Sequence, residues 1–104
     1  MTSADKAKTL TDENNKRAYE NRMQELMQIP DIISVLTIVE EKIHQAIDKG
    51  EYVIYISNKI NDIIINKDII DVIEYFGYCV REDLAQCCIA DMKIIGYLIS
   101  WNKI

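Results

Sequence analysis

Residues 31–57, DIISVLTIVEEKIHQAIDKGEYVIYIS, contain the change of hydrophobic period that decides the fold. In the first part, apolar side chains recur at the 3.6-residue spacing of one helix face, up to a stop at Gly50. From Glu51 to Ser57, β-forming residues occupy both alternating sets of positions, which is typical of a strand covered on both faces. The stretch therefore predicts a helix over 32–49 and a central strand over 51–57. The helix face consists of Ile32, Leu36, Val39, Ile43 and Ala46 or Ile47.

The chain after this strand predicts a second helix and further strands. Residues 58–67 are ambiguous, because their isoleucines suit a strand while their asparagines favour turns. Helical spacing returns over 68–76 and ends at Gly77. A short strand is expected over 78–81, followed by a turn at 82–83.

A hairpin is expected at the C-terminal end, in which residues 85–90 pair with residues 93–101 around Asp91 and Met92. Alternate apolar residues of its last strand form a period-2 face that we expect to pack on the helix over 32–49. These residues are Ile95, Tyr97, Ile99 and Trp101.

The N-terminal segment is polar. Leu10 is the first large apolar side chain after Met1, so we expect residues 1–10 to form a mobile or partner-ordered arm. A helix is expected to begin with Thr11 as its N-cap and to end before Pro30. Tyr19, Met23 and Leu26 form its narrow apolar seam, which suits packing on a second copy. We expect a homo-oligomer through this seam, and a trimer is favoured over a dimer.

Taken together, the order of elements predicts an α+β fold with a helix packed on a short mixed or antiparallel sheet. Residues 1–30 are interpreted as an arm and helix for anchoring or oligomerisation, and residues 31–104 as the globular domain. A chain of 104 residues with 49% apolar and 28% charged residues fits one folded domain.

Charge and hydropathy exclude several partner classes. The net charge of −5 disfavours nucleic acid, because phosphate binding requires clustered Lys and Arg. No apolar run approaches the length of a membrane span or of a signal peptide core, so no membrane partner is expected.

The sequence predicts no catalytic, cofactor or metal site. His44 is the only histidine, and a surface histidine beside acidic neighbours is a better interpretation of it than an acid–base pair. Cys79, Cys87 and Cys88 lack the spacing of a zinc site and are interpreted as reduced, mostly buried thiols. The scattered acids form no calcium loop, and the three glycines form no phosphate loop.

The aromatic side chains allow two interpretations. They line a ligand groove if several point outward, whereas they complete an aliphatic core if they point inward, and the core is favoured. The set comprises Tyr52, Tyr55, Tyr75, Phe76, Tyr78, Tyr97 and Trp101.

Three short segments resemble small tailed-bacteriophage virion proteins. They are Ile43–Gly50, Phe76-Gly77-Tyr78-Cys79-Val80 and Ile99-Ser100-Trp101, which follow the order I-x2-A-x3-G, GY-x-V and ISW. The similarity covers roughly residues 32–101, and the cysteines are not part of it. It implies a non-enzymatic structural component of the head or tail, present in several copies. Within that pattern, Gly50 and Gly77 are implied as helix stops, and Tyr78, Val80, Ile99 and Trp101 as packing residues.

The leading hypothesis is therefore a phage structural protein located in the virion, as a head-associated decoration or fibre subunit bound to other virion proteins. The alternative is a phage-encoded inhibitor that binds a host defence protein or sequesters a small nucleotide. An enzyme is the least favoured class.

Overall fold

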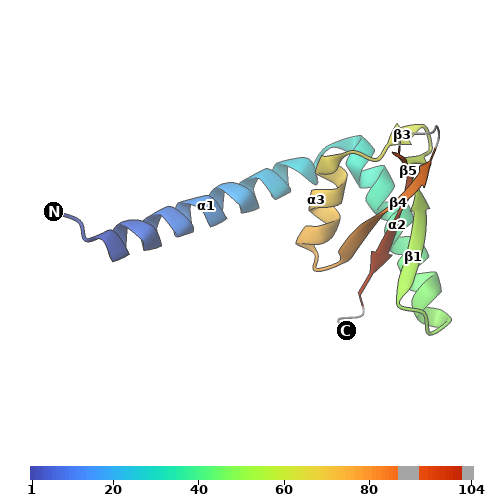
Figure 1. Cartoon of the computed structure of the whole chain (residues 1–104), viewed down its shortest axis with the longest axis horizontal. Helices are drawn as coiled ribbons and strands as arrows, with labels where there is room; N and C mark the ends of the chain where they lie inside the picture. The colour runs from blue at the N-terminus through green and yellow to red at the C-terminus, as the bar shows by residue number, and fades with distance from the viewer. Residues whose placement is uncertain (87–91, 102–104) are drawn as a thin grey trace.

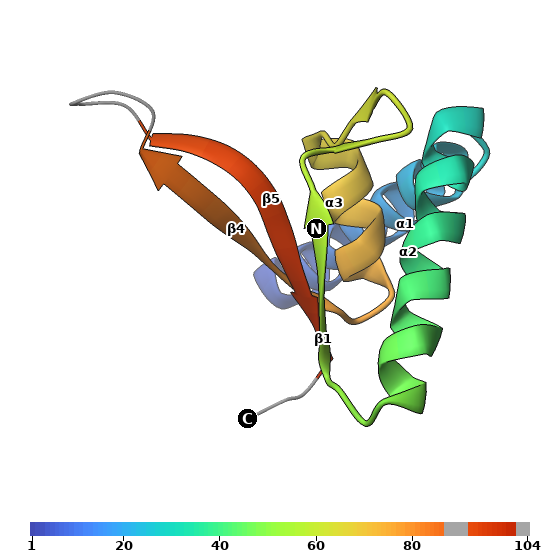
Figure 2. The same ribbon diagram turned by 90° about the vertical axis from the view of Figure 1, so that its right-hand side faces the viewer.

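A computed structural model describes residues 1–86 and 92–101, and it confirms the predicted α+β class. Three helices accompany a three-stranded antiparallel sheet of order β1-β5-β4 and a separate two-stranded hairpin, β2-β3. The helices lie on one side of the three-stranded sheet, while α1 projects away from the body (Figures 1 and 2). None of the helices in the described residues is both long and apolar enough to cross a membrane.

Helix α1 spans Ala4–Leu26, so it begins seven residues before the expected start at Thr11. Residues 4–10 of the expected arm are therefore helical, because a local cap starts the helix: the Lys6 N–H donates to Ser3 Oγ at 3.3 Å. The negative charge of Asp5 in the first turn interacts favourably with the positive end of the helix dipole.

Helix α2 spans Pro30–Asp48, close to the predicted 32–49. Pro30 occupies the first turn, where its missing N–H costs no hydrogen bond, and Asp31 lies inside the helix. Gly50 follows the helix with φ 73°, a conformation that favours glycine and that stops α2 as the resemblance implies.

Strand β1, Val53–Ser57, lies at the edge of the sheet, and its residues alternate between exposed and buried, so the expectation of a central strand covered on both faces is wrong. It is followed by β2, Lys59–Ile60, and β3, Ile63–Ile64. The ambiguous segment is therefore a small hairpin, turned by Asn61 and Asp62 with φ of 50° and 65°. Two consecutive positive φ angles are typical of a type I′ turn, and Asn and Asp tolerate them best among non-glycine residues.

Helix α3 spans Lys67–Tyr75, and the Asn66 side chain caps it by accepting the Ile69 N–H at 3.0 Å. Gly77, with φ 96°, follows the helix and turns the chain into β4. This second stop also agrees with the resemblance.

Strand β4 spans Cys79–Gln86 and pairs with β5, Met92–Ser100. The expected turn at 82–83 is wrong, because β4 continues through Glu82 and Asp83 opposite Tyr97 and Gly96. The predicted hairpin is therefore correct in its two segments, 85–90 and 93–101, but its first strand begins six residues earlier, at Cys79. Of the expected hairpin, residues 87–91 lie outside the described residues.

The period-2 face of β5 is confirmed only in part. Tyr97 and Ile99 are buried with Ile54 and Ile56, their partners on β1, whereas Trp101 is half-buried. Ile95 is 39% exposed, because the register shifts there: Asp83 pairs with Gly96 and Leu84 with Ile94, which leaves Ile95 as an extra residue.

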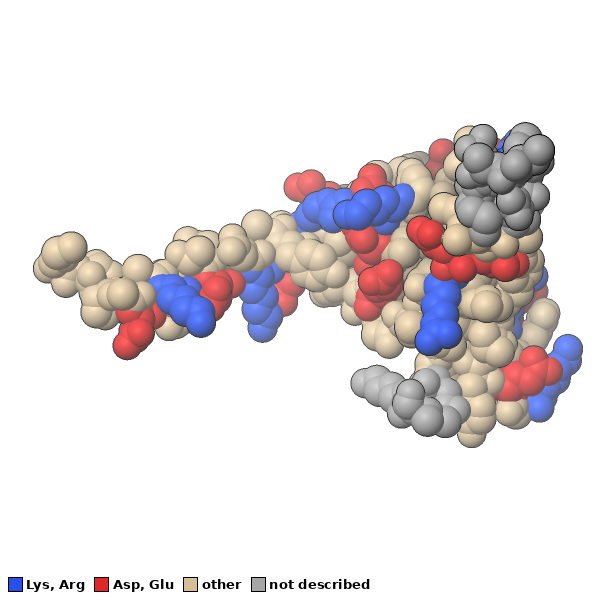
Figure 3. All heavy atoms as spheres, viewed as in Figure 1, with Lys and Arg blue, Asp and Glu red and all other residues tan. Residues whose placement is uncertain are grey.

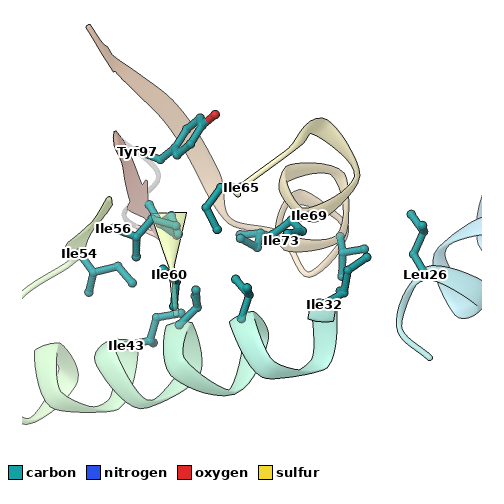
Figure 4. Packing of buried hydrophobic residues seen from close by; sticks show 14 of the residues in the cluster. Leu26, Ile32, Ile43, Ile54, Ile56, Ile60, Ile65, Ile69, Ile73 and Tyr97 are labelled. Atoms are coloured by element: carbon teal, nitrogen blue, oxygen red, sulfur yellow. The ribbon is translucent and has the colours of Figure 1, made fainter. Parts of the chain in front are cut away.

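One aliphatic core joins these elements. Isoleucines from β1 and α3 point toward each other above α2 (Figure 4). The last turns of α1 add Met23 and Leu26 to the same core, so the packing crosses the expected division at residue 30.

Candidate functional site

The predicted oligomer seam lies at the junction of α1 and α3. Met23 is 0% and Leu26 is 9% exposed, within the core of the same chain. Tyr19 is 44% exposed, and its ring meets Tyr75 edge-on at a centroid distance of 5.9 Å. Met23 and Leu26 are therefore covered within one chain, which corrects the expectation that these two residues need a second copy to cover them. Oligomerisation through α1 stays a prediction.

Arg22 ties the same junction together from outside. Its guanidinium contacts an Asp68 carboxylate oxygen at 2.6 Å and an Asp71 carboxylate oxygen at 3.2 Å, both on α3. The hydrogen bond to Asp71 and the charges of both carboxylates raise the pKa of Arg22 against a smaller desolvation effect. These two contacts join the last turns of α1 to α3 at the surface.

The remainder of α1, Ala4–Ala18, has no buried residue. Its charges of both signs alternate along the projecting rod (Figure 3), and residues 4–26 carry five basic and five acidic side chains. Leu10, 46% exposed, is its one large apolar side chain. This segment is the largest part of the described chain with no intramolecular cover.

An apolar groove of about 340 Å³ lies between α2, α3 and the beginning of β4. Phe76, 57% exposed, borders it, and Glu40 is its only charged lining residue. The lining consists of Leu36, Val39, Glu40, Ile43, Ile73, Phe76 and Tyr78. Such a wall suits an aliphatic or aromatic group rather than a phosphate.

His44 lies on the solvent side of α2, as expected, with Nε2 3.8 Å from a Glu40 carboxylate oxygen. Both side chains are mostly exposed, so the contact is a weak surface contact. Cys79 is exposed, which corrects the expectation of buried thiols for this residue, whereas Cys87 and Cys88 lie outside the described residues. Among residues 1–86 and 92–101, no three His, Cys, Asp or Glu side chains are grouped to hold a metal ion.

The aromatic residues divide between the two interpretations. Tyr97 is buried and Tyr75, Tyr78 and Trp101 are half-buried, so these four complete the core or its rim. Tyr52, Tyr55 and Phe76 are exposed, but Phe76 borders the groove between α2 and α3, whereas both tyrosines belong to β1 or its approach. They therefore form no single aromatic site.

A second groove of about 220 Å³ follows β1 on the side of α2, and sequence reasoning missed it. Its helix wall contains two lysines, and its strand wall contains uncharged residues of β1. The lining consists of Lys42, Gln45, Ala46, Lys49, Glu51, Val53, Ile54 and Tyr55. The uncharged run Tyr52–Ser57 was the available signal, but a sequence alone does not show that β1 is an edge strand.

No protein family model, curated protein or solved structure matches this chain.

Proposed function

We propose that this protein is a non-enzymatic assembly protein, and in particular a bacteriophage structural subunit of the head-associated decoration or fibre type. The observation that carries the proposal is the projecting part of α1, Ala4–Ala18, whose side chains are all exposed. A lone helix of this length is marginal in water, since most helical stability comes from packing. A partner that packs along the rod supplies the missing contacts.

The virion assignment is supported in addition by the resemblance of three segments to phage structural proteins. In this proposal α1 attaches the subunit, or joins copies of it as a trimer or dimer, and the body is displayed. Charges of both signs on α1 suit a protein partner with a mixed surface better than a polyanion.

The proposal is tested by mass spectrometry of purified particles from cells that produce the protein. We expect the full chain to co-purify in many copies per particle, and Leu10→Glu to lower its copy number. Ile47→Glu is the matched control, because Ile47 is a similarly exposed apolar residue on α2. Absence of the wild-type chain from particles contradicts the virion assignment.

The alternative is a phage-encoded inhibitor that remains free of particles and binds a host protein. The acidic body of this protein supports the alternative: residues 27–104 contain seven basic and twelve acidic side chains, a net charge of −5. The larger groove does not support nucleotide sequestration, because its lining has an acidic residue and no basic one. The particle analysis separates the two functions.

A further inference from the structure

The two outer edges of the three-stranded sheet are unlike each other. Among the described strands, β1 pairs with β5 alone, and its run Tyr52–Ser57 contains no charged residue and no proline, the usual protections of an edge strand. Strand β4 also pairs with β5 alone, but it carries Arg81, Glu82 and Asp83 in succession.

The hydrogen-bond pattern shows which groups of β1 are free for another strand. The Trp101 N–H donates to the Tyr52 carbonyl at 3.1 Å, and the Asn58 N–H donates to the Ile95 carbonyl at 3.2 Å. In an antiparallel ladder, alternate residues face the partner. Val53, Tyr55 and Ser57 therefore direct their N–H and C=O groups away from β5.

The free edge of β1 faces a groove with basic side chains on its other wall. In Figure 2, β1 lies between β5 and α2. Lys42 of α2 and Lys49, the residue that caps its C-terminal end, line the groove beside Val53 and Tyr55, and neither lysine forms an ion pair within the described residues. Glu51 is the one acidic residue in the lining.

The opposite edge of the same sheet carries the complementary charge. Glu82 is exposed and Asp83 is half-buried, and the hairpin of β4 and β5 extends beyond the helices on the side away from α2 (Figure 2). Strand β4 is therefore accessible to another molecule along its outer side.

We infer that β4 of one copy adds to the free edge of β1 of a second copy, in the groove between β1 and α2. Main-chain hydrogen bonds supply the affinity, as in other strand additions. Successive side chains of a strand point to opposite faces of the sheet, so one of the carboxylates of Glu82 and Asp83 approaches Lys42 and Lys49. The contact uses different surfaces on the two copies, so it repeats from copy to copy and forms a ring or a filament.

Charge selects this pairing over the two symmetric ones. Joining two β1 edges brings the lysine pairs of both copies together, and joining two β4 edges brings their acidic pairs together. Like charges in such positions are unfavourable. The inference rests on the sheet and on the groove between β1 and α2, and it does not require the virion assignment or an interface along α1.

Sedimentation velocity of the full chain, from micromolar to millimolar concentration and at low and high salt, tests the inference. We expect oligomers that grow with concentration and weaken with salt. Lys42→Glu/Lys49→Glu and Glu82→Lys/Asp83→Lys should each weaken association by at least about tenfold. An equimolar mixture of the two variants should associate again, because each basic surface then meets an acidic one.

Lys59→Glu/Lys67→Glu is the matched control, since it makes the same change of charge outside the groove, β4 and α1, and it should leave association unchanged. Amide hydrogen exchange gives a second measurement: the N–H groups of Val53, Tyr55 and Ser57 should exchange more slowly in the oligomer than in the dilute monomer. A chain that stays monomeric at millimolar concentration, or an oligomer unaffected by both charge reversals, overturns the inference.

Discussion

Replacing Met23 with alanine measures how firmly the body holds α1. Met23 is fully buried where α1 meets α3, so the substitution removes its contacts and leaves a cavity. Truncation of a buried methionine costs about 2–5 kcal/mol, out of about 5–15 kcal/mol expected for a whole domain. We expect a value in the middle of that range, because Met23 lies at the edge of the core, where neighbours can partly relax.

Urea denaturation followed by far-UV circular dichroism gives the free energy of unfolding. The matched control is Leu10→Ala on the exposed part of the same helix, which should change that free energy by less than about 0.5 kcal/mol. Equal small effects of both substitutions would refute the placement of α1 in the core. If the loss in free energy of unfolding caused by Met23→Ala rises with protein concentration, Met23 lies instead at an interface between copies.

Three further measurements test individual contacts. Gly96→Ala should lower the free energy of unfolding by about 1–3 kcal/mol in urea denaturation, because a Cβ at Gly96 would overlap the Tyr55 side chain and lie 2.6 Å from the Ile56 carbonyl oxygen. Burial, aided by the charge of Glu82, raises the pKa of Tyr97, so the folded state favours the neutral phenol. The contribution of Tyr97 to the free energy of unfolding is fully present below about pH 10 and should be lost as the pH rises above that value. Tyr97→Phe should reduce this alkaline loss, and an unchanged pH profile contradicts the assignment. Trp101 is half-buried and meets Tyr78 edge-on at 6.1 Å, so its fluorescence should shift to the red on denaturation, and a constant emission maximum would show an exposed ring.

The elements with a strong hydrophobic period were predictable from the sequence. The face of α2 and the change to β-forming residues at β1 placed both elements within about two residues, but the pattern at β1 did not show that this strand lies at the edge of the sheet. The start of α1 was not predictable from hydropathy, since Ala4–Leu10 is stabilised by a cap and by helix propensity rather than by burial. Strand β4 was cut short at Glu82, because charges indicate a turn unless the strand is known to lie at an edge.

The seam on α1 shows the same limit. The spacing of Tyr19, Met23 and Leu26 identified an apolar stripe, but spacing does not say whether the stripe packs on a second copy or on α3. That choice depends on the angle between α1 and the body, which Pro30 and the contacts of Arg22 set in three dimensions.

The continuity of α1 has a mechanical consequence. The helix contains no glycine or proline, and 23 residues extend about 35 Å at the helical rise. Because Arg22 and the buried side chains fix one end, the rod behaves as a lever and not as a tether. A partner that grips the far end therefore sets the orientation of the body as well as its position. Neighbouring copies held in this way share a common tilt, which reduces the rotational entropy lost when their bodies meet.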